Sequence, residues 1–129
     1  MLVIRKAQMQ AFSAARDIAF ADWARGHLRC MCPTQTQALS DTELRRRALV
    51  GLERARAAGF TEPQLVAEFL VLMFRYAPDF DSHPEVHQAL KRELPREMLL
   101  LTLPSAVRPE TLAHIQARAG DHLWNTQEH

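Results

Sequence analysis

The chain has 129 residues, which suits one domain of ordinary size with a hydrophobic core that needs neither metal ions nor disulfides. Hydrophobic residues make up 47% of it and charged residues 24%, a balance typical of globular rather than disordered proteins. The net charge of +1 excludes a global basic field that would draw the protein onto nucleic acid or anionic lipid.

The first predicted element is a long helix over residues 4–29. Its apolar residues recur at steps of three and four, which is the spacing of one helix face. They form two adjacent stripes: Ile4, Ala7, Ala11, Ala14, Ile18, Ala21 and Leu28 in one, and Met9, Phe12, Ala19 and Trp23 in the other. The resulting apolar face is broad enough to contact more than one partner helix.

A loop and a second helix follow. Residues 32–36 contain a proline among polar side chains, which indicates a loop. Ser40 and Glu43 have the spacing of a capping box, which predicts the start of a helix that reaches about Ala58. We expect its arginines to point mostly outward. Its inner stripe is Leu44, Ala48, Leu52 and Ala55, with Gly51 allowing close packing.

The third predicted helix is the most apolar segment and the expected centre of the fold. Gly59 ends the preceding helix, and Pro63 occupies the first turn, where its missing N–H costs nothing. The apolar residues between positions 65 and 76 cover two neighbouring faces. The helix should end before Pro78, because proline disfavours a helical residue ahead of it.

Three shorter helical segments complete the chain. They are predicted over about 82–92, 96–101 and 110–124, with Pro104 and Pro109 as breaks. No pattern favours a strand. The sequence therefore predicts an all-α fold, a compact single-domain bundle of five to six helices.

The two cysteines, Cys30 and Cys32, are expected to be free thiols in a reducing compartment. Residues two apart in an extended chain point to opposite sides, and no second cysteine pair completes a zinc site. A redox pair is the alternative. The N-terminus lacks the apolar core of a signal peptide, and apolar runs of about six residues cannot cross a bilayer. We therefore expect a soluble, cytoplasmic protein with no membrane association.

One group of residues has the composition of a metal site. Asp79 and Asp81 precede His83 and His87, and the two histidines are four residues apart, so all four could face one ion. The interpretation we favour is that the aspartates and Ser82 are loop and N-cap residues at the positive end of a helix. No nucleophile elbow, phosphate-binding loop or dinucleotide fingerprint occurs. We therefore expect no catalytic residue, no metal and no cofactor.

The apolar run over residues 98–103 is the best candidate for a protein interface. It lies between Pro95 and Pro104, so its helix is short. If the run is exposed, it would bind another protein; otherwise it closes the core from the far side. The candidate partner-binding residues are Met98, Leu99, Leu100 and Leu103.

Charge is unevenly distributed between two neighbouring segments. Residues 41–56 are net basic and residues 61–85 are net acidic, which indicates either complementary surfaces or adjacent helix faces that balance each other. The basic segment also carries acidic residues and has no helix-turn-helix joint, so we do not expect nucleic-acid binding. Arg45 and Arg46 are candidate contacts for an acidic protein partner.

Three motifs carry a resemblance to a known group of proteins. They are I-R-x-x-Q-M-x-x-F over residues 4–12, A-x-x-x-G-[F/I]-T-E over residues 55–62 and P-D-F-D-x-x-P over residues 78–84. Together they resemble small helical proteins of Gram-negative bacteria that are encoded among type VI secretion genes. The similarity covers residues 3–92, and residues 93–129 form a C-terminal helical extension that many relatives lack.

The resemblance implies an accessory role in effector loading. Such proteins look like co-chaperones that bind a larger adaptor chaperone, which in turn holds an effector and its PAAR spike tip. We therefore expect a non-enzymatic co-chaperone or adaptor, whose extension binds the adaptor chaperone, the effector or the spike protein. The alternatives are an immunity protein that neutralises a cognate toxin and, third, a small metal-dependent enzyme. The sequence does not determine the oligomeric state.

Overall fold

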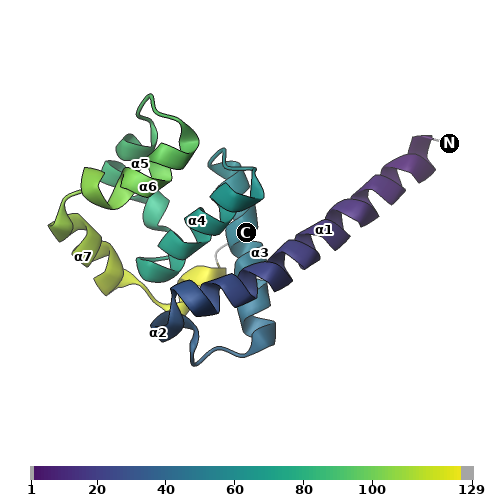
Figure 1. Ribbon diagram of the computed structural model, residues 1–129, viewed down its shortest axis with the longest axis horizontal. Coiled ribbons are helices and arrows are strands. Elements are labelled where there is room, and N and C mark those ends of the chain that lie inside the picture. The colour runs from purple at the N-terminus through teal and green to yellow at the C-terminus, as the bar shows by residue number, and fades with distance from the viewer. Residues whose placement is uncertain (1, 126–129) are drawn as a thin grey trace.

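The computed structural model describes residues 2–125, with side chains from residue 14 onward, and every regular element in that range is a helix (Figure 1). The predicted all-α class is therefore confirmed. The elements in chain order are α1 (Leu2–Met31), α2 (Pro33–Thr36), α3 (Asp41–Ala57), α4 (Pro63–Arg75), the 3₁₀ helix η1 (Phe80–Ser82), α5 (Pro84–Leu90), α6 (Arg96–Ala106), α7 (Pro109–Arg118) and the 3₁₀ helix η2 (Asp121–Asn125).

The predicted number of helices is slightly wrong, because the described residues form seven α-helices. The additional one is α2, in the segment expected to be a loop. Pro33 stands at its first position, where a fixed φ suits a helix and no N–H is needed. The Thr36 N–H donates to the Cys32 carbonyl at 3.1 Å, and its hydroxyl donates to the same oxygen at 2.8 Å. A proline that reads as a loop signal in sequence is here a helix start.

Two predicted helix boundaries near the C-terminus are also corrected. Pro104 was expected to break its helix, yet α6 continues through it to Ala106. A proline this close to the C-terminal end removes one backbone hydrogen bond, and the buried Leu103 and Val107 on either side of it hold the turn in place. The helix predicted over 110–124 is split, since the backbone of Ala119 is extended and η2 starts a new turn.

α1 is covered by the bundle only in its C-terminal half. Ala21, Ala24 and Leu28 are fully buried, whereas Ala14 and Ile18 of the same predicted stripe are exposed. The first three positions of that stripe lie among the residues whose side chains are not described. Figure 1 shows the reason: the N-terminal half of α1 runs out beyond the other helices.

Ion pairs join α1 to α3, which packs along it. Arg56 donates two hydrogen bonds to Asp17, at 2.9 and 3.1 Å, and Arg45 donates two to Asp22, at 2.8 and 3.2 Å. The arginines on this part of α3 therefore face a neighbouring helix and not only solvent. They fix how α1 lies on the bundle.

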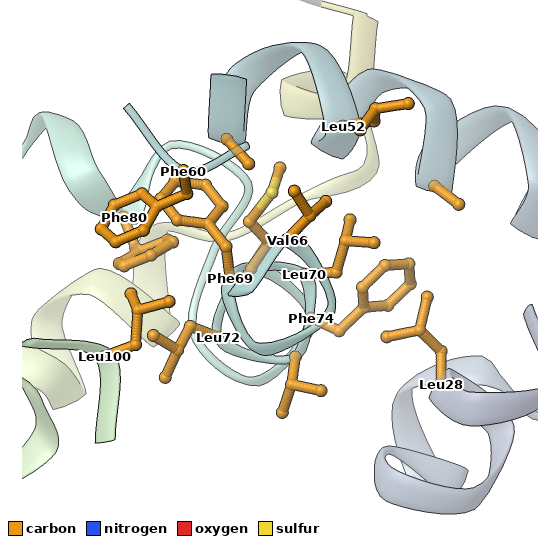
Figure 2. Packing of buried hydrophobic residues seen from close by; sticks show 14 of the residues in the cluster. Leu28, Leu52, Phe60, Val66, Phe69, Leu70, Leu72, Phe74, Phe80 and Leu100 are labelled. Carbon is orange, nitrogen blue, oxygen red and sulfur yellow. The ribbon is translucent and has the colours of Figure 1, made fainter. Parts of the chain in front are cut away.

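α4 is the buried centre of the fold, as the sequence predicted. Every residue from Leu65 to Phe74 is buried except Glu68. Seen end-on in Figure 2, its side chains radiate toward residues of other helices, including Leu28 and Leu100. The ring of Phe69 lies 5.6 Å from that of Phe60 and 5.0 Å from that of Phe80, measured between centroids.

Gly51 brings α3 close to this central helix. A Cβ at this position would overlap the side chain of Leu70. Gly59 has a different role, because it ends the α3 turn with a φ of +96°. Only glycine adopts that backbone conformation without strain.

The C-terminal extension contributes to the same core as the rest of the chain. Leu100, Leu103, Val107, Ile115 and Trp124 belong to one cluster of buried residues with the side chains of α3 and α4. The Trp124 ring packs 4.7 Å from that of Phe74, measured between centroids. No described helix combines the length and the apolar character that crossing a bilayer requires.

Candidate partner-binding surface

The outer side of α6 carries a narrow apolar strip. Leu94 precedes the helix and is 41% exposed, Met98 in the first turn is 39% exposed, and Leu101 is 69% exposed. Met98 and Leu101 are three residues apart within α6, so they lie on one side of the helix, and Leu94 lies just ahead of its start. We call Leu94, Met98 and Leu101 the α6 strip.

Three of the predicted partner-binding residues face the other way. Leu99 and Leu100 are 3% exposed and Leu103 is fully buried. The interpretation in which the run closes the core therefore holds for these three, and in this fold they cannot be reached by a partner. The sequence predicts one patch because a run with five apolar residues in six positions does not show which helix face turns inward. Only packing on α4 and α5 decides that.

The remaining predicted residue, Met98, keeps its place in the candidate surface, and it is joined there by two leucines. The signal for Leu101 was in the sequence, since positions 98 and 101 have helical spacing, whereas Leu94 lies ahead of the helix and only the structure shows its exposure. The signal for Leu101 was masked by the contiguous run of leucines. A test of the interface must therefore change Met98 and Leu101 rather than the buried leucines.

Polar groups flank the α6 strip. Arg92 donates from Nε to the Ala89 carbonyl at 2.8 Å and from Nη2 to the Thr102 hydroxyl at 3.0 Å. The guanidinium of Arg96 lies 5.4 Å from the centre of the Phe60 ring, the range of a cation–π contact. Arg92, held by these two hydrogen bonds, is thus a polar neighbour of the strip, as polar groups are at the rim of many protein interfaces.

Arg45 and Arg46 lie away from this strip, because α4 stands between α3 and α6 (Figure 1). The structure thus does not bring together the two sets of predicted residues. Arg45 is bound to Asp22, as described above. Arg46 donates to both carboxylate oxygens of Glu43, at 3.0 and 2.6 Å, and to the Trp124 carbonyl at 3.2 Å.

Arg47 corrects the expectation that the arginines of α3 point outward. Its side chain is only 9% exposed. Its Nε donates to Glu43 at 2.7 Å, its Nη2 lies 3.2 Å from a carboxylate oxygen of Asp121, and its guanidinium lies over the Trp124 ring. Hydrogen bonds from Arg46 and then Arg47 lower the pKa of Glu43 from 4.5 to about 2. This cluster attaches η2 to α3.

The candidate metal group has structural partners in the fold. Asp81 accepts a hydrogen bond from Arg54 at 2.7 Å, so the basic and acidic segments balance each other at this point. His83 Nδ1 accepts from the Glu85 N–H at 3.1 Å, which makes it the N-cap of α5. His87 is exposed. Within the described part of the chain, no three histidine, cysteine or acidic side chains are placed to hold a metal ion.

Both thiols and His27 lie near the C-terminal end of α1. Cys30 is exposed on α1, and Cys32 is buried just past its end, where burial raises the pKa of the thiol. The two cysteines are thus on a helix end and not on the extended chain that the sequence argument assumed. His27 stacks on Trp23, with ring centroids 5.1 Å apart.

Comparison of the chain with known protein families, with curated proteins and with solved structures gave no match. The resemblance to accessory proteins of type VI secretion therefore stays a prediction.

Proposed function

We propose that the chain is a non-enzymatic accessory protein that binds a larger protein through the α6 strip. In the setting that the resemblance implies, the partner is an adaptor chaperone, an effector or a spike protein of type VI secretion. The observation that carries the proposal is the exposure of Met98 and Leu101 on one side of α6, with the exposed Leu94 just ahead of the helix.

Such a strip suits helix-in-groove recognition. In that mode, apolar residues three, four and seven positions apart insert into a hydrophobic groove of the partner. Full burial of one leucine or methionine side chain contributes about 1.5–3 kcal/mol, so three anchors can supply much of the driving force for a reversible complex. The buried Leu100 and Leu103 support this surface from behind, which keeps the exposed residues in a fixed arrangement.

Steering by charge is the second part of the proposal. Arg92 is bound to Thr102 beside the strip, Arg96 is an exposed arginine at the start of the same helix, and Arg45 is a further exposed arginine on α3. Basic groups around an apolar contact favour an acidic partner and speed its association at low salt. Because Arg45 is already bound to Asp22, we expect it to change the rate of association more than the affinity.

The test is an affinity pull-down of the tagged chain from its native host, read by mass spectrometry. The variant is Met98→Asp with Leu101→Asp, since both side chains are exposed and the fold should survive. Met31→Asp is the matched control, because it places the same charge on an exposed apolar residue of α1.

Recovery of an adaptor, effector or spike protein by the native chain and by the control, but not by the α6 variant, is the expected result. Recovery of a toxin domain alone would favour an immunity protein. Equal recovery by all three baits, or no specific protein from any, would remove the α6 strip as the binding site.

A further inference from the structure

A second group of exposed apolar residues, independent of the α6 strip, lies on α1 at Ile18 and Trp23. Residues 2–13 of this helix, which we call the arm, extend beyond the bundle (Figure 1). Among the residues that follow, Ile18 is 44% exposed and Trp23 is 54% exposed. Among the described side chains of α1, the first that is fully buried is that of Ala21.

The arm has the composition of a helix that packs against something. Its sequence holds Leu2, Val3, Ile4, Met9 and Phe12. A helix of this length is marginal in water by itself, since most helical stability in proteins comes from packing of an apolar face. An apolar arm that projects from its own bundle therefore calls for a surface outside that bundle.

A groove suited to a helix lies next to the arm, where α1 meets α3 and the start of α4. It has a volume of about 620 Å³. Its apolar lining includes Ala19, Phe20, Trp23, Leu52, Pro63 and Val66. The rings of Phe20 and Trp23 are tilted against each other, with their centroids 5.9 Å apart. Trp23 is the more exposed of the two and lies at the solvent side of the groove. We call this the α1 groove.

We propose that the arm of a second copy of this chain occupies the α1 groove. The two α1 helices would run antiparallel about a two-fold axis near residue 13, so that each arm lies along residues 14–25 of the other copy. At about 1.5 Å per residue, the arm is about 18 Å long, and the facing segment has the same length. Such an isologous contact covers both arms and both grooves with a single repeated interaction.

The charge pattern of α1 favours this orientation. Arg5, Lys6 and Arg16 are its only charged residues before Asp17. A parallel, in-register pair would place each of these cations beside its own copy, which is unfavourable. The antiparallel pair keeps Arg5 and Lys6 apart from the same residues of the other copy and away from Arg16, and places them at the level of Asp22, which also accepts two hydrogen bonds from Arg45.

The mass of the full chain in solution tests the proposal. Light scattering and sedimentation over a dilution series should give twice the mass of one chain. Trp23→Asp in the groove and Phe12→Asp in the arm should each abolish the dimer. Leu101→Asp is the matched control on α6 and should leave the dimer intact, while circular dichroism and thermal melting check that each variant is folded.

Cysteine cross-linking tests the orientation. In a Cys30→Ser background, Ser13→Cys lies near the crossing point and should give a disulfide-linked dimer, whereas Arg5→Cys should not. Cross-linking of Arg5→Cys as readily as Ser13→Cys would exclude the antiparallel arrangement. The proposal as a whole is overturned if the native chain is a monomer at every concentration, or if its dimer survives Trp23→Asp or dissociates on Leu101→Asp.

Discussion

The distance between neighbouring helices decides whether a glycine in this protein can be replaced by a larger residue. Gly26 and Gly51 both lie inside long helices, yet their surroundings differ. A Cβ at Gly26 would meet nothing within 4 Å, whereas a Cβ at Gly51 would overlap Leu70, a buried side chain of the central helix. The same amino acid is therefore a weak point of α1 and a packing requirement of α3.

We expect opposite effects when each glycine is changed to alanine. Gly51→Ala should destabilise the protein by about 1–3 kcal/mol, because Leu70 has little room to move. Gly26→Ala should stabilise it by about 0.4–1 kcal/mol, because alanine reduces the entropy of the unfolded chain and adds no contact. Urea unfolding of both variants at constant m-value measures the two changes. Equal effects would show that α3 and α4 are not in close contact.

At the scale of an element, α6 shows how one helix divides its apolar residues between core and surface. Its leucines at 99, 100 and 103 pack inward, and Leu101 points to solvent. Truncation of a buried leucine leaves a cavity and therefore costs more stability than truncation of the exposed Leu101.

Adjacent substitutions in α6 test this division directly. Leu100→Ala should lower the free energy of unfolding by about 2–5 kcal/mol, the range for a buried leucine. Leu101→Ala should change it by no more than about 0.5 kcal/mol. Thermal denaturation followed by circular dichroism compares them. A large loss of stability with Leu101→Ala would mean that α6 is rotated from the position described.

At the scale of the whole molecule, two carboxylates connect the C-terminal extension to the rest of the bundle. Glu85 on α5 accepts from the Thr111 hydroxyl at 2.6 Å and from the Arg108 N–H at 2.7 Å, which attaches the start of α7. The bond from Thr111 has the largest effect on the carboxyl group, and together the two bonds lower the pKa of Glu85 from 4.5 to about 2. Glu43 on α3 has a similar role for η2. It accepts hydrogen bonds from Arg46 and Arg47, and these two arginines contact Trp124 and Asp121 of η2.

These shifts predict the acid sensitivity of the fold. A carboxylate whose folded pKa is lowered stabilises the protein fully above its unfolded pKa of 4.5, and the stabilisation is lost as the pH falls toward 2. The contribution of these groups to stability should therefore be constant with pH near neutrality and decline through that acidic window. Glu85→Gln should lower the neutral-pH stability and flatten the decline, as measured by melting temperature against pH. Glu93→Gln, at an exposed position, is the control.

Much of the fold follows from local signals that act within a few residues. The Ser40 hydroxyl accepts from the Glu43 N–H at 3.1 Å, as the capping box predicted. Pro63 and Gly59 mark a helix start and a helix end where the sequence placed them. Such signals are reliable because caps and stops depend on the backbone next to them.

The candidate surfaces depended on contacts between residues far apart in the chain. The sequence by itself determined the helical class and the apolar centre at α4, since helical periodicity and composition are properties of each segment. Only the tertiary structure decided which side of α6 turns inward, how far the bundle covers α1 and that Arg47 is buried. Each of these outcomes is set by a neighbouring helix whose position the local pattern does not contain.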